Sequence, residues 1–496
     1  MLKENLKSKS VGANCIRPHF EGITKNHNGI TLIALIITII VMMILVAVSV
    51  TVALDGGLFG TAKKAASETE LKAEEEMLLS AVVGAIGTDA KVDFNKIQLP
   101  DGFTGKNGTY TSSKGNTFVV SENGEITELK IGTGVTLVPY EELTGDLKTA
   151  MDEGKITAVL KEIKDGVEYQ AVIPVGFKVS TKSGENTISG GLVIFDKDGN
   201  EFVWVPCTTD ASDTSGLTLY AQDKQYNIEP TSKQWYYTNY SDWKDEGGDV
   251  NSVTKYGGFY VGRFEAGISS NVSFYANTNG AEYKVYDGTT NLRDVATYIP
   301  VSKPNNPSWN FISQANAKIV SENMYGNSTS VESSLIDSYA WDTIVNWMES
   351  EKTGIAIDST NYGNYLNSSI SLVDGVYATY KHNFSNNTMS YATEYQRGTI
   401  DIPARSRQGE QMMYEIATGS AEKTKVLNIY DMAGNMWEWT TEAGNHDAGI
   451  NAKQYAVIRG GSVYHNGDTS LSYRHGNDDI SFRGFNVGFR VVLYLK

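Results

Sequence analysis

The chain has 496 residues, a formal net charge of −16 at pH 7 and 41% hydrophobic residues. This length leaves room for about two to four domains with sizeable cores. The acidic balance, with no cluster of basic residues, argues against nucleic acid as a partner. Two cysteines, Cys15 and Cys207, are too few for a cysteine-rich zinc or iron–sulfur site.

The first predicted element is a transmembrane helix over residues 30–54, a run of twenty-five residues without one charge. At ~1.5 Å per residue it spans about 37 Å, enough to cross a hydrocarbon core of about 30 Å. Residues 1–29 carry five basic and two acidic side chains, a net charge of +3. The positive-inside rule therefore keeps this end in the cytoplasm and places everything from Asp55 onward outside. A buried core helix and a plain signal anchor are the alternatives.

The residues around Gly29 read KNHNG and then ITLIAL, a basic segment, a glycine and an apolar helix. This pattern resembles the leader of type IV pilins and pseudopilins. The resemblance implies a prepilin peptidase that cuts after Gly29, a mature chain that begins at Ile30, and pilus-assembly components as partners at a bacterial cell surface. Most pilins have a glutamate at the fifth mature position, where this chain has Ala34. Ala34 suits a minor pilin at the fibre tip, and equally an anchor that never polymerises.

A second helix is predicted over residues 61–86, after a break at residues 55–57. The apolar stripe of this helix consists of Leu71, Leu78, Val82 and Ile86. The opposite, charged face consists of Lys63, Lys64, Glu70, Lys72 and Glu74. Short alternating runs follow over 91–138 and predict β-hairpins. We assign 55–138 to a pilin-like module. Residues 139–170 read as a charged helical spacer, or as a capping helix of either neighbour.

The second module extends over residues 171–496. Its predicted elements are two strands joined by a turn at 197–200, a strand at 256–267, and a helix at 334–349 with one apolar face. The expected class of the whole chain is α+β, with an N-terminal helix, a small antiparallel sheet and a larger C-terminal domain.

Three motifs stand in order near the C-terminus: DMAGNMWEW, RGGS and GFRV. With FVWVP and GFYVGRFE before them, they resemble the formylglycine-generating-enzyme (sulfatase-modifying factor) family over residues 173–496. The resemblance implies a variant of the C-type lectin fold, a small twisted sheet with long irregular loops.

Most residues of these motifs are expected to have structural roles. Trp437 and Trp439 are two apart, so on a strand they face the same side, which we expect to be the core. The glycines of RGGS suit a close backbone approach. We expect Arg459 and Arg490 to pair with buried carboxylates.

Four positions of DMAGNMWEW match residues that hold calcium in the family: Asp431, Gly434, Met436 and Glu438. The resemblance implies two carboxylates and two backbone carbonyls around Ca²⁺, which prefers oxygen ligands. The alternative is a hydrogen-bonded turn in which Asp431 bonds its own backbone.

Oxidase members of the family bind copper through two cysteines shortly after RGGS, because copper(I) needs soft thiolates. Here the matching positions hold His465 and Ser470, and Cys207 lies far upstream. We therefore expect no copper, no catalytic residues and no enzyme. An exported oxidase and a structural pseudopilin of a secretion system are the alternative functions.

The segment 463–486 mixes aromatic and polar residues with almost no aliphatic ones, the composition of an adaptable binding surface. It predicts a site for an extracellular protein or glycan, and hence an adhesin. The candidate ligand-binding residues are Tyr464, His465, Asn466, Asp468, Tyr473, His475, Asn477, Asp478, Phe482, Phe485 and Asn486. The segment also resembles the mutable window of variable proteins made by diversity-generating retroelements. A fixed binding loop and an ordinary polar loop are the alternatives.

Overall fold

The computed structural model describes residues 58–88, 90–120, 124–222, 243–245, 247–268, 294, 296–390, 395–445 and 454–496. The predicted leader and the predicted transmembrane helix lie outside these residues. Within them, no helix is long and apolar enough to cross a membrane. The chain divides into two compact units, residues 1–73 and 74–496, and the second contains all the sheets.

Helix α2, Leu58–Val83, begins before the second unit and ends in it. In the second unit Leu78 and Val82 are fully buried, as their stripe predicts, whereas Ile86 is 43% exposed. The placement of Glu74 on the charged outer face was wrong. Glu74 is buried and accepts hydrogen bonds from Ser112 Oγ (3.0 Å) and Asn116 Nδ2 (2.7 Å), because it lies one turn before Leu78 on the same stripe.

The hairpins predicted after this helix form a four-stranded antiparallel sheet in the order β1-β2-β3-β4. Its strands are β1 Phe103–Lys106, β2 Thr109–Ser112, β3 Thr117–Val120 and β4 Ile126–Glu128. The short 3₁₀ helices η1 Phe94–Lys96 and η2 Tyr140–Glu142 precede and follow the sheet.

The prediction of a helical spacer was wrong for its second half. Helix α3, Gly145–Asp152, lies between β5 Val135–Leu137 and β6 Ile156–Lys164, and these two strands form a three-stranded sheet with β7 Val167–Pro174. Asp165 and Gly166 both have positive φ, 52° and 84°, which makes a tight two-residue hairpin turn between β6 and β7. Strand β6 also buries five residues in succession, which overrides the helical appearance of its charges.

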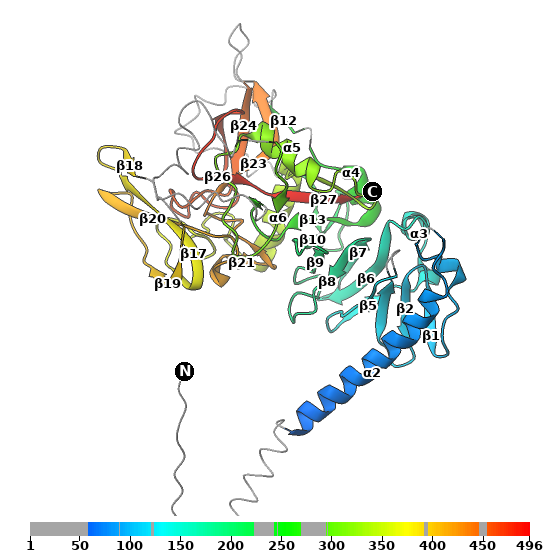
Figure 1. The fold of residues 1–496 in the computed structure, drawn as a ribbon. Helices are drawn as coiled ribbons and strands as arrows, with labels where there is room; N and C mark the ends of the chain where they lie inside the picture. The colour runs from blue at the N-terminus through cyan, green and yellow to red at the C-terminus, as the bar shows by residue number, and fades with distance from the viewer. Residues whose placement is uncertain are drawn as a thin grey trace, which may run out of the picture. The chain divides into compact units, whose positions relative to one another are not determined.

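A seven-stranded sheet forms the centre of the second unit (Figure 1), with the path β16-β27-β13-β10-β9-β8 and β11 paired with β10. Its strands are β8 Phe177–Val179, β9 Val193–Asp196, β10 Glu201–Thr208, β11 Thr218–Leu219, β13 Gly258–Gly262, β16 Val331–Leu335 and β27 Val491–Leu495. The predicted turn at 197–200 joins β9 to β10, and the predicted strand at 256–267 is β13.

Both faces of this sheet are buried. Along β10, Trp204 packs into one hydrophobic cluster with Ile173 and Leu493, while its neighbours Val203 and Val205 pack into another. The second cluster includes helix α6, Ser338–Glu351, which Asp337 caps by accepting from the Ala340 amide at 2.8 Å. The predicted helix therefore exists but begins later than expected, because residues up to 335 pair in β16. Helices α4 Val250–Tyr256 and α5 Gln314–Met324 complete the α-helices of the described chain.

The remaining strands frame the C-terminal region. One sheet has the path β12-β23-β24-β25, with β26 parallel to β23, and another joins β18, β19 and β20 to β17. Their bounds are β12 Trp243–Lys244, β17 Ile370–Asn383, β18 Thr388–Ser390, β19 Gln396–Ile402, β20 Glu410–Ile416, β23 Trp437–Asn445, β24 Gln454–Arg459, β25 Arg474–Asp479 and β26 Val487–Phe489. Two short pairs, β14 Gly267–Ile268 with β15 Pro300–Val301 and β21 Lys425–Val426 with β22 Ile429–Tyr430, and the 3₁₀ helix η7 Glu422–Thr424 complete the set.

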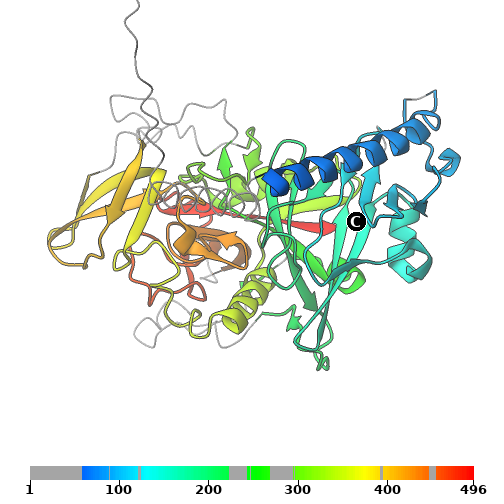
Figure 2. The same cartoon turned by 90° about the horizontal axis from the view of Figure 1, so that it is seen from below.

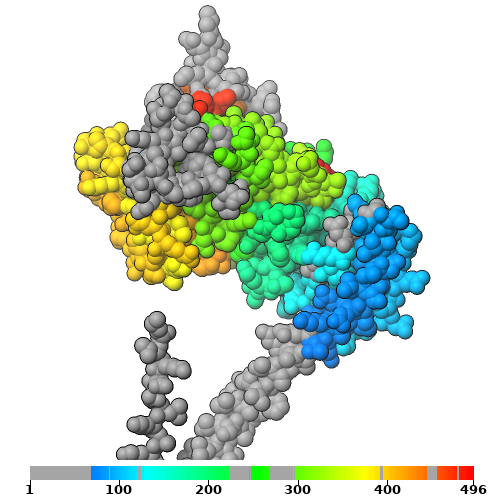
Figure 3. All heavy atoms as spheres, viewed as in Figure 1, coloured from blue at the N-terminus to red at the C-terminus, as the bar shows by residue number. Residues whose placement is uncertain are grey.

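Strand β27 runs through the middle of this unit, as Figure 2 shows, with the β17–β20 sheet on one side and β6–β7 on the other. Figure 3 shows the same order at the surface, where green atoms lie between the yellow segment around β17 and the cyan segment around β6. The fold of the second unit is thus mixed, with sheets predominating.

Candidate functional site

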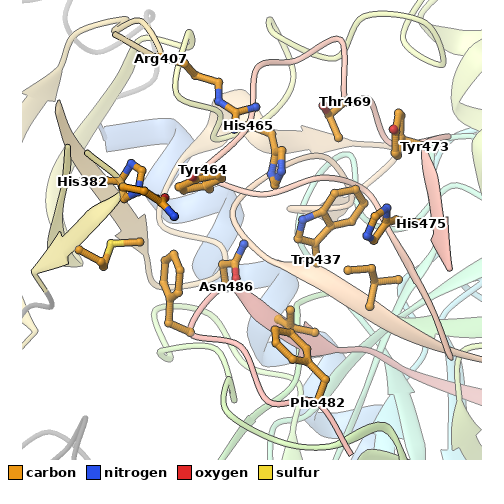
Figure 4. A pocket seen from close by; sticks show the side chains of 15 residues that line it. His382, Arg407, Trp437, Tyr464, His465, Thr469, Tyr473, His475, Phe482 and Asn486 are labelled. Atoms are coloured by element: carbon orange, nitrogen blue, oxygen red, sulfur yellow. The ribbon is translucent and has the colours of Figure 1, made fainter. Parts of the chain in front are cut away.

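A pocket of about 550 Å³ opens where the β17–β20 sheet meets the β23–β24–β25 sheet (Figure 4). Two long connections complete its wall, residues 460–473 between β24 and β25 and residues 480–486 between β25 and β26. This volume falls within the ~300–1,000 Å³ range of small-molecule sites.

Seven of the eleven predicted ligand-binding residues line this pocket: Tyr464, His465, Tyr473, His475, Phe482, Phe485 and Asn486. Asn466 is half-buried and Asp468 is exposed, and neither belongs to the lining. Asn477 and Asp478 lie in β25, and their side chains are outside the described part of the structure. The two connections therefore bring together residues that are separated by up to twenty-two positions in the sequence.

The sequence did not indicate the other eight lining residues: His382, Asn387, Met389, Arg407, Trp437, Ile458, Thr469 and Val487. Four of them come from the β17–β20 sheet and its connections, more than fifty residues before the predicted segment. Trp437 was expected in the core. It is 5% exposed, as expected, yet it also forms part of the pocket wall.

The backbone of the first connection depends on a glycine. Gly461 has a φ of +74°, and a Cβ at this position would lie 2.2 Å from the Thr469 carbonyl oxygen. Ser462 then fixes both connections, because its Oγ accepts from Asn486 Nδ2 at 3.0 Å and lies 3.0 Å from His465 Nδ1. The expected close backbone approach in RGGS is confirmed.

Aromatic rings pack along the pocket wall. The Trp437 ring centroid lies 5.2 Å from that of His465 and 5.9 Å from those of Tyr473 and His475. Tyr464 lies 5.0 Å from His382, and the Arg407 guanidinium is 5.0 Å from the Tyr464 centroid. These packed rings hold the polar edges of the pocket in fixed positions.

Buried ion pairs support the strands behind the pocket. Arg459 Nη2 lies 2.5 Å from Asp342 Oδ1, and both side chains are fully buried. Arg490 makes a bidentate pair with Glu438, at 3.0 Å from Nε to Oε2 and 2.7 Å from Nη2 to Oε1. The prediction that both arginines pair with buried carboxylates is confirmed.

The donors expected around calcium do not fit that ion. Both oxygens of Glu438 accept from Arg490, and Asp431 Oδ2 accepts from the Thr418 hydroxyl (2.9 Å) and the Gly419 amide (2.8 Å). Of the four oxygens of these two carboxylates, Asp431 Oδ1 alone has no hydrogen-bond partner. Even together with the two expected backbone carbonyls it falls short of the ~6–8 oxygens that Ca²⁺ takes. Gly434 and Met436 lie between Asp431 and Glu438 in the same segment.

A third carboxylate, Glu265, is buried beside these two. Burial, and then the charges of Asp431 and Glu438, raise the pKa of Glu265 well above its ordinary value. The pKa values of Asp431 and Glu438 are raised as well, first by burial. One guanidinium, Arg490, thus compensates part of the charge of three buried acids, and a proton on Glu265 compensates more.

The positions that match the copper cysteines have other roles. His465 lies in the pocket wall against Trp437, while Ser470 points away from it and donates to the Ala356 carbonyl at 2.6 Å. Cys207, in β10, is buried, and burial raises the pKa of its thiol. The described residues contain no cysteine pair that could hold copper.

The framing strands and the long connections carry the motifs that resemble the formylglycine-generating-enzyme family, at the C-terminal end of the chain. In agreement, the family model for the Sulfatase-modifying factor enzyme 1-like domain matches residues 374–495. The match does not include residues 173–373, over which the motifs FVWVP and GFYVGRFE suggested the same family.

No curated protein sequence matches the chain. Among solved structures, CarF is 14% identical, with a TM-score of 0.25 and coverage of 48% of this chain and 87% of the CarF chain. The Major Tropism Determinant I1 variant is also 14% identical, with a TM-score of 0.24 and coverage of 79% of this chain and 83% of its own. At these TM-scores neither likeness bears on function.

Proposed function

We propose that the C-terminal domain is a non-enzymatic ligand-binding module of adhesin type. The observation that supports this most is the pocket itself, an opening of about 550 Å³ whose lining includes seven residues of the segment predicted to bind. The wall is rich in rigid aromatic side chains and in hydroxyl and amide groups, which suits binding at low entropic cost. A pocket without thiols does not meet the copper requirement of the oxidase members.

Binding by the purified full chain, solubilised in detergent, to arrays of glycans and surface proteins tests this proposal. Thr469→Trp should fill the pocket and abolish the array signals, and Phe482→Ala should weaken them without filling it. Thr104→Trp, on the exposed face of β1, is the matched control and should bind as the wild type does. Array signals that survive both pocket variants, or no signals with any ligand, would refute the proposal that this domain binds a ligand in the pocket.

The N-terminal segment gives the module its proposed location. We propose that residues 1–29 are removed after Gly29 and that the helix from Ile30 anchors the chain in the membrane or in a pilus tip, with its bulk outside the cell. N-terminal sequencing of the protein from cells should begin at Ile30. A chain that still begins at Met1 would rule out cleavage and leave a plain signal anchor.

We also propose that a retroelement diversifies the pocket. Tyr464, His465, His475, Phe482 and Phe485 line it and are all residue types that mutable asparagine codons reach. The flanking DNA should then contain a reverse-transcriptase gene and a near-repeat of the segment for 463–486, mismatched at adenines. A locus without such a repeat would contradict diversification and leave a binding site of fixed sequence.

A further inference from the structure

We propose that the pocket recognises a sugar ring that carries a carboxylate. This inference rests on the proposed binding function and names its ligand class. It follows from three properties of the lining: its charge, its polar groups without partners and its aromatic walls.

The charge of the lining is opposite to that of the chain. The whole sequence has 58 acidic and 42 basic residues, yet the fifteen lining residues include Arg407 and three histidines and no aspartate or glutamate. Since acids predominate elsewhere, an acid-free pocket with a guanidinium at its rim favours an anionic ligand.

Arg407 is set apart from the buried arginines of the same region. Arg459, Arg474 and Arg490 each pair with a carboxylate, whereas Arg407 is exposed and pairs with no acid among the described residues. It is held instead over the Tyr464 ring. A guanidinium held by stacking keeps its planar fork of N–H donors available, the geometry that matches a carboxylate.

Several polar groups in the pocket have no partner within the described chain. They are the Trp437 indole N–H, the Tyr464 hydroxyl and the Thr469 hydroxyl. Trp437 is 5% exposed, and Figure 4 shows its indole nitrogen directed into the pocket. Tyr464 and Thr469 are half-buried, and none of the three groups is fully buried without a partner, so all three can donate to a ligand in the pocket. Their positions match a ligand with several hydroxyl groups.

His382 adds a further group of this kind. It is 3% exposed and lines the pocket, with Nε2 at 3.1 Å from Asn387 Oδ1, and its Nδ1 has no partner. Beside these polar groups, Phe482 is 40% exposed and presents an apolar surface to the same opening. A carboxylated sugar offers an anion, hydroxyl groups and a C–H face together, whereas an acidic peptide side chain offers only the anion.

Four small probes separate the parts of this inference in calorimetric titrations of the detergent-solubilised full chain. Methyl β-glucuronide and the methyl glycoside of N-acetylneuraminic acid both carry a ring, hydroxyl groups and a carboxylate, and they represent two sources of such sugars. Methyl β-glucoside lacks the carboxylate, and cyclohexanecarboxylate lacks the hydroxyl groups. At least one sugar acid should bind at least tenfold more tightly than either partial probe, and its affinity should fall with added salt.

Arg407→Gln should reduce the affinity for that sugar acid at least tenfold. Arg397→Gln, which removes the same charge from an exposed strand outside the pocket, should have no effect. Equal binding of methyl β-glucoside would overturn the role of the carboxylate, and equal binding of cyclohexanecarboxylate would overturn the role of the sugar. If neither sugar acid binds while the arrays identify a pocket-dependent ligand of another class, the inference fails and the proposed function stands.

Discussion

The buried ion pair of Arg490 and Glu438 can be tested by a substitution whose effect distinguishes an ion pair from a calcium site. Besides the two bonds to Glu438, Arg490 donates to the carbonyl oxygens of Gly262 at 2.8 Å and Tyr430 at 2.9 Å. Arg490→Met keeps most of the volume and removes all four bonds. It leaves Glu438 beside the carboxylate of Asp431 without a compensating charge.

Breaking a fully buried ion pair from one side costs ~3–5 kcal/mol, because the remaining charge stays desolvated. Each carbonyl that loses its donor adds a penalty of ~1–3 kcal/mol, and these contributions overlap because the groups are in contact. We therefore expect the free energy of unfolding to fall by at least ~3 kcal/mol. The assay is urea unfolding of the full chain followed by tryptophan fluorescence, with the wild type and the variant compared in the same detergent.

The matched control is Arg397→Met, since Arg397 pairs with Asp374 where both side chains are about two-thirds exposed. This variant should leave the unfolding midpoint unchanged. Chelation of divalent cations should also leave the wild-type midpoint unchanged, because Arg490 and not calcium satisfies Glu438. A loss below ~1 kcal/mol in Arg490→Met, or a midpoint that falls on chelation, would refute this reasoning.

Three further predictions concern other parts of the second unit. Gly461→Ala should destabilise the fold and weaken ligand binding, because the new Cβ would lie 2.2 Å from the Thr469 carbonyl oxygen. The control is Gly409→Ala, since Gly409 has a φ of +60° and open space around it. Thermal unfolding should detect no comparable loss of stability in this control. Burial and a nearby carboxylate raise the pKa of Asp337 to about 7 from 3.8, so its stabilising contribution is complete below pH 3.8 and is lost as the pH rises to about 7. Asp337→Asn should remove this term, and its stability relative to the wild type should rise between pH 4 and pH 7; parallel pH profiles would contradict the shift. Burial raises the pKa of the Cys207 thiol, so peptide mapping after maleimide treatment should find Cys207 labelled only in denatured protein, and rapid labelling of the native chain would show that the thiol is accessible.

Local sequence chemistry was enough to predict several elements of the second unit. The β9–β10 hairpin follows from two β-rich runs around a polar turn, and α6 follows from the spacing of its buried face. Trp439 is fully buried and donates from Nε1 to the Ile312 carbonyl at 3.0 Å, as expected of a core tryptophan. In these cases the side-chain pattern and the final environment agree.

The wrong predictions arose where tertiary contacts override a local pattern. Charged residues in 156–164 suggested a helix, but the Asp165–Gly166 turn folds this segment against β7. Glu74 appeared to belong to a solvent face, since its partners Ser112 and Asn116 lie about forty residues away. No window of local sequence contains those partners.

The pocket shows the same limit. Its half from 463–486 could be predicted because the segment is unusual in composition, with aromatic and polar residues and few aliphatic ones. The other half comes from β17, β18 and the connection before β20, where His382 and Arg407 carry no local sign of a binding role. Only the packing of two sheets brings these residues to one opening, and Trp437 belongs to both the core and the wall.

The most direct test of the account is a crystal structure of the full chain bound to the ligand that the arrays or the titrations identify. We expect the ligand to lie in the pocket, within hydrogen-bond distance of the Trp437 indole nitrogen and of Arg407. A ligand bound elsewhere on the chain, with this pocket filled only by water, would contradict it.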